Sequence, residues 1–134
     1  MMKVGGRCHC GKIAFEAEVD PDLVGICHCA DCQMLSGSPY RIVAPADAGK
    51  FVLLNGKPRI YIKTADSGNK WAIAFCAECG TPIYAAAAEN PETYSLRVGT
   101  LNERANLAPK LQIWCDSALP WAMDLRAVEK LPRQ

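Results

Sequence analysis

Short stretches in which apolar residues recur at every second position are spread along the chain and predict β-strands. Every second residue from Ile13 to Val19 is apolar and two of the residues between them are glutamates, which is the pattern of a half-buried strand. Seven further segments are strand candidates: Tyr40–Val43, Phe51–Leu54, Arg59–Lys63, Trp71–Phe75, Pro82–Ala85, Tyr94–Val98 and Leu111–Cys115. The pattern therefore favours a chain made mainly of short strands.

Turn residues separate several of these segments, and the helical pattern is sparse. Asn55–Pro58 and Asp66–Asn69 have the residue types that connect neighbouring strands. Short helical turns are expected only at Asp31–Leu35 and Leu125–Leu131. Regular short strands favour an all-β sheet or open barrel over alternating βαβ units. No repeat, linker or change of composition marks a boundary, so we expect residues 1–134 to form a single domain.

Composition and charge exclude several classes of partner. The 134 residues are 50% hydrophobic and 22% charged, as in ordinary globular proteins. A net charge of +1 without a basic stripe argues against nucleic-acid binding. The chain reaches Cys8 before any apolar leader forms, and no apolar run approaches the roughly 20 residues of a membrane span. We therefore expect a soluble cytoplasmic protein with no nucleic-acid or membrane partner, and the sequence does not specify an oligomeric state.

Eight cysteines are the main chemical feature of the sequence. In a reducing cytoplasm, so many cysteines favour metal ligation or catalysis over disulfides. Seven of them lie within three residues of another cysteine, in the segments Cys8–Cys10, Cys27–Cys32 and Cys76–Cys79. Zinc needs sulfurs that converge to roughly 2.3 Å from the metal, and C-x-C and C-x-x-C spacings place pairs of sulfurs on one side of the backbone. The spacing therefore predicts bound zinc.

The number of ligands in each cluster distinguishes two kinds of site. A C-x-C pair and the late C-x-x-C pair together supply four ligands, which is typical of a closed structural site. The middle cluster, with Cys27, Cys29 and Cys32, supplies three and so favours a site with an open position for substrate. The alternatives are that all seven cysteines are structural, with Cys115 or a histidine as the last ligand, or that some form disulfides.

Three further residues near the clusters have more than one interpretation. His9 and His28 each lie between two cysteines, so their imidazoles should point away from a metal that the flanking thiolates share. Cys115 stands alone. It is interpreted first as a small buried apolar residue, and otherwise as a fourth zinc ligand or a reactive thiol.

Residues that follow the middle cluster are candidates for moving a proton or contacting substrate. Asp31, Tyr40 and Arg41 are the proton-transfer candidates, although Asp31 also suits a solvated turn or a helix cap. The loop Ser36–Ser38 is expected either to approach substrate or to form an ordinary turn before Pro39. Three tryptophans are expected to contribute to the core and a pocket wall: Trp71, Trp114 and Trp121.

The cysteine motifs and their surroundings resemble the glutathione-dependent formaldehyde-activating enzyme family, also called the GFA or CENP-V domain family. The resemblance runs from Gly6 to Trp121 and rests on the segments Gly6–Phe15, Cys27–Gln33, Ser36–Ser38, Phe75–Tyr84, Val98–Leu101 and Pro120–Trp121. It implies a mainly β, Mss4-like (β-tent) single domain of short antiparallel strands around zinc sites. It also implies two Zn²⁺ ions, one structural and one in a second site that is able to lose its metal. The implied ligands are Cys8, Cys10, Cys76 and Cys79 for the structural ion, and Cys27, Cys29 and Cys32 for the second.

The resemblance implies a carbon–sulfur lyase that handles the adduct of glutathione and formaldehyde, with a small thiol such as glutathione as its partner. Three thiolates make zinc a weak Lewis acid that suits a fourth sulfur, which agrees with thiol–aldehyde chemistry at Cys27, Cys29 and Cys32. Two residues depart from the family pattern. Gln112 stands where relatives often have histidine, and Asn102 where an acid is common.

Two other functions are weighed against the lyase. A non-catalytic zinc module that binds a protein partner would tolerate a closed or empty second site. A thiol-based sulfoxide reductase using Cys115 would share the fold, but the histidine motifs of that class are absent, since His9 and His28 are the only histidines in the chain.

Overall fold

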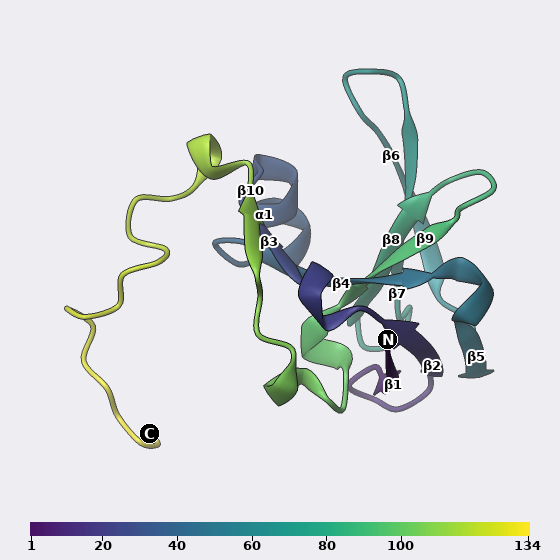
Figure 1. Cartoon of the computed structure of the whole chain (residues 1–134), viewed down its shortest axis with the longest axis horizontal. Helices are drawn as coiled ribbons and strands as arrows, with labels where there is room; N and C mark the ends of the chain where they lie inside the picture. Colours follow the sequence, from purple (N-terminus) through teal and green to yellow (C-terminus); the bar gives the residue numbers. More distant parts are fainter.

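The computed structural model describes residues 1–134 and consists mainly of short strands (Figure 1). The strands are β1 (Met2–Arg7), β2 (Ala14–Val19), β3 (Gly25–Cys27), β4 (Arg41–Asp47), β5 (Val52–Asn55), β6 (Arg59–Thr64), β7 (Lys70–Phe75), β8 (Pro82–Ala87), β9 (Thr93–Arg97) and β10 (Leu111–Ile113). The α-helix, α1, covers Ala30–Ser36. Single 3-10 turns cover Pro21–Leu23, Ala48–Lys50, Val98–Thr100, Arg104–Asn106 and Cys115–Ser117.

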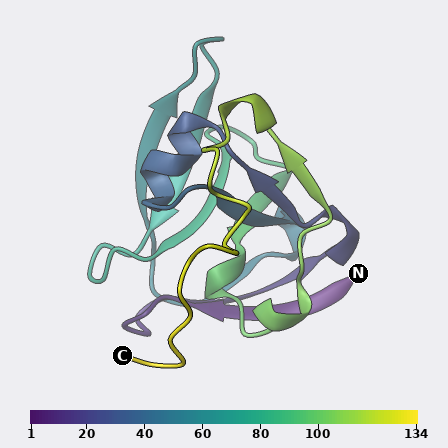
Figure 2. The ribbon, with the colours of Figure 1, turned by 90° about the vertical axis from the view of Figure 1, so that its left-hand side faces the viewer.

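All ten strands belong to one sheet, whose main path runs in the order β1-β2-β4-β9-β8-β7-β6. Strand β5 pairs with β2, and β3 pairs with both β4 and β10. Neighbouring strands are antiparallel except for β3 and β10, which are parallel. The predicted mainly β class is therefore confirmed. Helix α1 lies between the β3–β10 pair and the β6–β7 hairpin (Figure 2).

Every segment predicted as a strand overlaps a strand of the structure, but β1 and β3 are not predicted. β1 has two glycines, and one of them is required by packing. A Cβ at Gly6 would lie 2.2 Å from the ring of Phe15, so the apolar alternation is interrupted where the strand crosses that side chain. β3 ends at Cys27 and has only three residues, which is too short to show a period.

The two predicted turns have different outcomes. Asp66–Asn69 joins the antiparallel pair β6 and β7, and the Ala65 N–H donates to the Asn69 carbonyl at 2.8 Å. Asn55–Pro58 does not form a hairpin, because β5 pairs with β2 instead of β6. At Gly56 φ is +75° and an added Cβ would lie 2.2 Å from the Lys12 carbonyl oxygen. The turn therefore packs against the loop that contains Lys12.

The helix predicted at Leu125–Leu131 is absent, whereas the one at Asp31–Leu35 is present as α1. The C-terminal segment instead extends away from the strands (Figure 1), and Leu125 and Leu131 are 59% and 69% exposed. A short helix is marginal in water unless an apolar face packs on the rest of the protein. No such packing is available to this segment within the chain.

A cluster of fifteen buried residues forms the core. Phe15, Leu96 and Ile83 are among its fully buried side chains, and each such side chain contributes about 1.5–3 kcal/mol through removal from water. Cys8 and Cys76 also belong to the core cluster. The prediction that the tryptophans pack in the core is wrong: Trp71, Trp114 and Trp121 are 40%, 65% and 59% exposed. No helix in the structure is both long and apolar enough to cross a membrane.

Candidate metal centres

Four cysteine sulfurs converge where the β1–β2 loop meets the β7–β8 turn. The Sγ atoms of Cys8, Cys10, Cys76 and Cys79 lie within 4.8 Å of one another. Tetrahedral zinc with Zn–S bonds of roughly 2.3 Å keeps its sulfurs about 3.8 Å apart. The Cys8–Cys10 and Cys10–Cys76 sulfur distances are 3.6 and 3.8 Å. This four-cysteine centre therefore has the spacing that a tetrahedral thiolate-bound metal requires.

Each of the two loops that carry these cysteines has a glycine that donates a backbone hydrogen bond to the first cysteine of the loop. Gly11 N–H donates to the Cys8 carbonyl at 3.1 Å, and Gly80 N–H donates to the Cys76 carbonyl at 2.8 Å. Both glycines adopt positive φ, +81° at Gly11 and +78° at Gly80, a conformation that costs glycine little. The positive φ lets each loop turn back so that its sulfurs face the other loop.

Hydrogen bonds from the surrounding chain reach two sulfurs of the four-cysteine centre, those of Cys8 and Cys79. Ile13 N–H donates to Cys8 Sγ at 3.3 Å. Thr81 Oγ1 lies 3.2 Å from Cys79 Sγ and also accepts from the His9 N–H at 3.0 Å. The Thr81 hydroxyl, followed by the backbone N–H groups of Cys10 and Thr81, lowers the pKa of Cys79 to about 5. A hydroxyl held in this way fixes the orientation of a ligand sulfur.

The sulfurs of the middle cluster, Cys27, Cys29 and Cys32, also lie within 4.8 Å of one another. No further cysteine, histidine or acid belongs to the group. Cys27 ends β3, whereas Cys29 is the N-cap of α1 and its Sγ accepts from the Cys32 N–H at 3.3 Å. Cys27 and Cys32 are buried and Cys29 is half-buried. This three-cysteine centre can hold a metal with one position left for another ligand.

The pKa values of Cys29 and Cys32 shift in opposite directions. Burial, followed by hydrogen bonds to Cys29 and Cys27, raises the pKa of Cys32. Burial also opposes ionisation of Cys29, but the Cys32 thiol and N–H, the Cys27 thiol and the charge of Arg41 together lower its pKa. A thiolate at Cys29 therefore forms more readily than one at Cys32, and a divalent cation would offset the repulsion among three thiolates.

Both histidines lie outside the converging ligand groups. His28 is fully buried, its Nε2 lies 2.8 Å from Gln112 Oε1 and its Nδ1 has no hydrogen-bond partner. His9 is exposed. Gln112 thus contacts the buried imidazole and anchors β10 to the segment that follows β3.

The structure changes the interpretation of one acidic candidate, Asp31, and of one thiol candidate, Cys115. Asp31 is exposed and pairs with Lys63, with 2.6 Å between Oδ2 and Nζ. It does not cap α1, because Cys29 does. The prediction that Cys115 is buried in a strand is wrong: it is exposed in the 3-10 turn after β10 and is not part of either cysteine centre.

The remaining candidates lie around α1. Ser36 and Gly37 line an apolar hollow of ≈ 450 Å³ between the end of α1 and β6–β8, whereas Ser38 does not line it. The Tyr40 ring meets the His28 ring edge-on, with 5.5 Å between centroids. Arg41 Nε and Nη1 are buried without a hydrogen-bond partner. Arg97 is also buried, and its burial was not recognised from the sequence. The feature that could have revealed it is the presence of an arginine within the apolar strand segment Tyr94–Val98.

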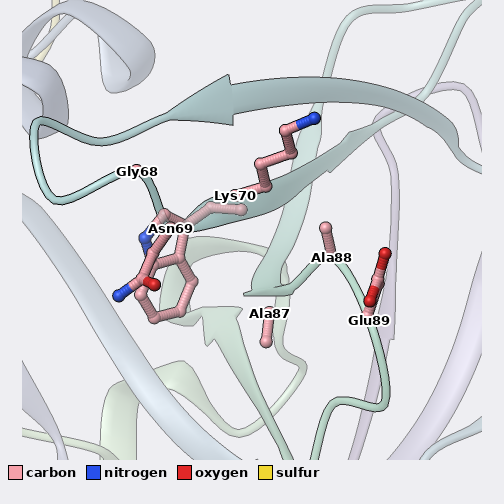
Figure 3. A pocket seen from close by; sticks show the side chains of 7 residues that line it. Gly68, Asn69, Lys70, Ala87, Ala88 and Glu89 are labelled. Atoms are coloured by element: carbon pink, nitrogen blue, oxygen red, sulfur yellow. The ribbon is translucent and has the colours of Figure 1, made fainter.

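A larger hollow of ≈ 540 Å³ lies away from the cysteines, at the end of the β6–β7 hairpin beside the β8–β9 turn (Figure 3). Trp71 forms one wall, so one tryptophan does line a pocket, and Lys70 and Glu89 supply charged groups. The hollow has no cysteine or histidine in its lining. The side chains that converge closely enough to bind a metal therefore lie at the two cysteine centres.

Comparison with known proteins identifies a similar fold and a family. A crystal structure of a Rhodobacter sphaeroides protein matches the fold with a TM-score of 0.62 and 24% sequence identity, covering 83% of this chain and 99% of that one. The family model described as glutathione-dependent formaldehyde-activating enzyme matches residues 3–117, which include both cysteine centres. The chain belongs to the glutathione-dependent formaldehyde-activating enzyme family.

Proposed function

We propose that this protein is a zinc-dependent carbon–sulfur lyase-type enzyme that forms or cleaves the adduct of a small thiol and an aldehyde. Glutathione and formaldehyde are the proposed pair, because the family model is described by them. The observation that carries the proposal is the three-cysteine centre, which has three convergent sulfurs and no fourth ligand from the chain. In the proposal, Cys8, Cys10, Cys76 and Cys79 hold a structural zinc and the chain acts as a single domain.

The proposed reaction needs no oxidant or reductant. The thiol sulfur attacks the carbonyl carbon, a new carbon–sulfur bond forms, and the thiol proton ends on the former carbonyl oxygen. Zinc bound by three thiolates would supply a soft site that binds the substrate sulfur as thiolate, which is the nucleophilic form. Cys29 at the N-cap of α1 is only half-buried, which supports access for a substrate sulfur from solvent.

Exchange NMR of glutathione with formaldehyde tests the proposal, because the adduct and the free thiol interconvert spontaneously and an enzyme must accelerate that exchange. The zinc-loaded protein should raise the exchange rate in proportion to its concentration. Cys29→Ser should abolish the acceleration by removing one ligand. Cys115→Ser is the matched control, since Cys115 is exposed and outside both centres. If the wild-type protein with both sites loaded leaves the rate unchanged, the substrate assignment is wrong and a non-catalytic zinc module is favoured.

A further inference from the structure

Two arginines near the three-cysteine centre lack an acidic partner. Arg97 is 7% exposed, and its one side-chain hydrogen bond runs from Nη1 to the Ser95 carbonyl at 3.1 Å. Arg41 is half-buried, with Nε and Nη1 fully enclosed and unpaired. Neither takes part in any of the ion pairs of the structure. Buried cations are normally paired or hydrogen-bonded, so a compensating negative charge is expected nearby.

Strand register places both arginines beside the cysteines that would carry the compensating negative charge as thiolates. Cys27 in β3 is opposite Arg41 in β4, and Val43 in β4 is opposite Arg97 in β9. Opposed residues of antiparallel strands project to the same face, as do residues two apart in one strand. Arg41 and Arg97 therefore project from the face of the sheet that carries Cys27.

Electrostatic coupling supports the same placement. Burial, and then repulsion from Arg41, lowers the pKa of Arg97 to about 9, while Cys32 acts in the opposite direction. Both guanidinium groups carry a positive charge at neutral pH, as arginine does in proteins generally. Asp31, the acid nearest in sequence, is already paired with Lys63 and does not compensate the arginines.

A charge count indicates the charge that a fourth ligand at the three-cysteine centre should carry. Three thiolates and one divalent cation carry a net charge of −1, and the two guanidinium groups bring the local total to +1. A neutral ligand such as water would leave this excess. A singly charged fourth ligand would cancel it, and in a partly buried site uncompensated charge is costly.

We propose that Arg41 and Arg97 make the open position of the three-cysteine centre selective for an anionic thiolate over neutral water. The inference rests on the proposed function and extends it, because it assigns the charge selectivity to two residues outside the ligand set. The arginines act on the bound sulfur through their charge and are positioning residues. The enclosed Nε and Nη1 atoms of Arg41 favour this role over capture of a carboxylate on the tail of the substrate.

Thiol binding to the Co²⁺-loaded protein tests the proposal without an activity assay, since a new sulfur ligand changes the sulfur-to-cobalt absorption. The probes are 2-mercaptoethanol, with a neutral tail, and 3-mercaptopropionate, with a carboxylate tail. At saturating Co²⁺, Arg41→Gln and Arg97→Gln should each weaken binding of both thiols by about 10- to 50-fold, the effect of one unit charge at partly buried distances. Arg41→Lys should recover most of the affinity. Arg59→Gln, an exposed arginine in β6, should bind both thiols as the wild type does.

Each other result has a defined meaning. Unchanged affinity of the folded Arg41→Gln variant for 2-mercaptoethanol overturns the proposal, and so does a loss confined to 3-mercaptopropionate, which would assign the arginines to the substrate tail. If Arg97→Gln does not fold, Arg41→Gln and Arg41→Lys decide the question. Failure of the wild-type cobalt protein to bind either thiol would instead reject the proposed function.

Discussion

The two cysteine centres use the same ligand but join very different stretches of chain. The four-cysteine centre brings together the β1–β2 loop and the β7–β8 turn, and its contacting pair Cys10 and Cys76 is 66 positions apart. The three-cysteine centre draws all its sulfurs from Cys27–Cys32. A metal that closes a long loop removes much of the unfolded chain's freedom, whereas one that closes a short loop removes little. From this difference in sequence separation we expect a metal at the four-cysteine centre to stabilise the fold more than one at the three-cysteine centre.

Each centre has two buried cysteines, and the four-cysteine centre also has the exposed Cys10 and the half-buried Cys79, so the centres differ in what their buried cysteines pack against. Cys8 and Cys76 are each 1% exposed and belong to the hydrophobic core cluster. The three-cysteine centre lies at the junction of the short strand β3 and the first turn of α1, where Cys29 is half-buried. The two ligands Cys8 and Cys76 are therefore held rigid by packing in the core. A site at the start of a short helix leaves a sulfur within reach of a ligand.

The largest expected effect follows from breaking the four-cysteine centre. Cys76→Ser should leave the chain largely unfolded in the presence of zinc. Structural zinc contributes about 10–16 kcal/mol in small domains, which is as large as the total stability of about 5–15 kcal/mol typical of such proteins. Circular dichroism melting measures the effect, with Cys115→Ser as the control. A cooperative melt close to that of the wild type would show that this centre does not hold the fold.

The corresponding change at the three-cysteine centre should separate function from folding. Cys29→Ser should lower bound zinc from two ions per chain to one and remove the proposed activity, while the cooperative melt persists. The reason is that this centre closes only a short loop. Elemental analysis together with the melt provides the measurement. Loss of folding comparable to that of Cys76→Ser would contradict the division of roles.

A smaller effect is expected from the hydroxyl beside the four-cysteine centre. Thr81→Val removes the contact with Cys79 Sγ and the acceptor for the His9 N–H. Loss of such a supporting hydrogen bond commonly lowers metal affinity by about 10–100-fold. Competition with a chelator should show faster or easier removal of one of the two zincs. Thr64→Val, in the exposed part of β6, should have no effect, and equal retention by both variants would refute the assigned role of Thr81.

The smallest effect concerns the ion pair that joins α1 to β6. Lys63→Met should change stability by no more than about 1 kcal/mol, because partly exposed pairs contribute little, and Lys63 and Asp31 side chains are 26% and 55% exposed. The thiol affinity of the three-cysteine centre should stay the same, since Cys29 caps the helix independently. Denaturant unfolding of Lys63→Met beside Lys70→Met gives the comparison. Loss of the metal from the three-cysteine centre in Lys63→Met would mean that the ion pair maintains the geometry of that centre.

The sulfurs that converge in the structure belong to the same cysteines that cluster in the sequence, because such clustering is local, and their role as zinc ligands stays a prediction. C-x-C and C-x-x-C spacing restricts where two sulfurs point, so the memberships of the three clusters were apparent from residue order. Ligand counting favoured joining Cys8–Cys10 to Cys76–Cys79 and the family resemblance implied it, but residue order alone does not show that the β1–β2 and β7–β8 loops meet, which depends on sheet topology. The role suggested for Arg97 also depends on register, and a lone arginine in an apolar strand does not reveal its neighbours.

The wrong predictions share a physical cause. Trp114 and Cys115 are residue types that favour burial, but they follow β10, a short strand that pairs only with β3, and they are exposed there. Asn55–Pro58 has good turn chemistry, yet β5 gains more pairing by joining β2. In each case tertiary pairing decides the outcome, and local residue preference does not determine which strands become neighbours.

The central claim is that only the three-cysteine centre has a position that exchanges with a thiol. Cadmium-113 NMR of the fully Cd²⁺-loaded protein tests it directly, since each centre should give its own resonance. Addition of glutathione should move one resonance, the one that Cys29→Ser eliminates, and leave the other in place. Two resonances that are both unaffected, or that both move, would contradict the claim that one centre is closed and the other open.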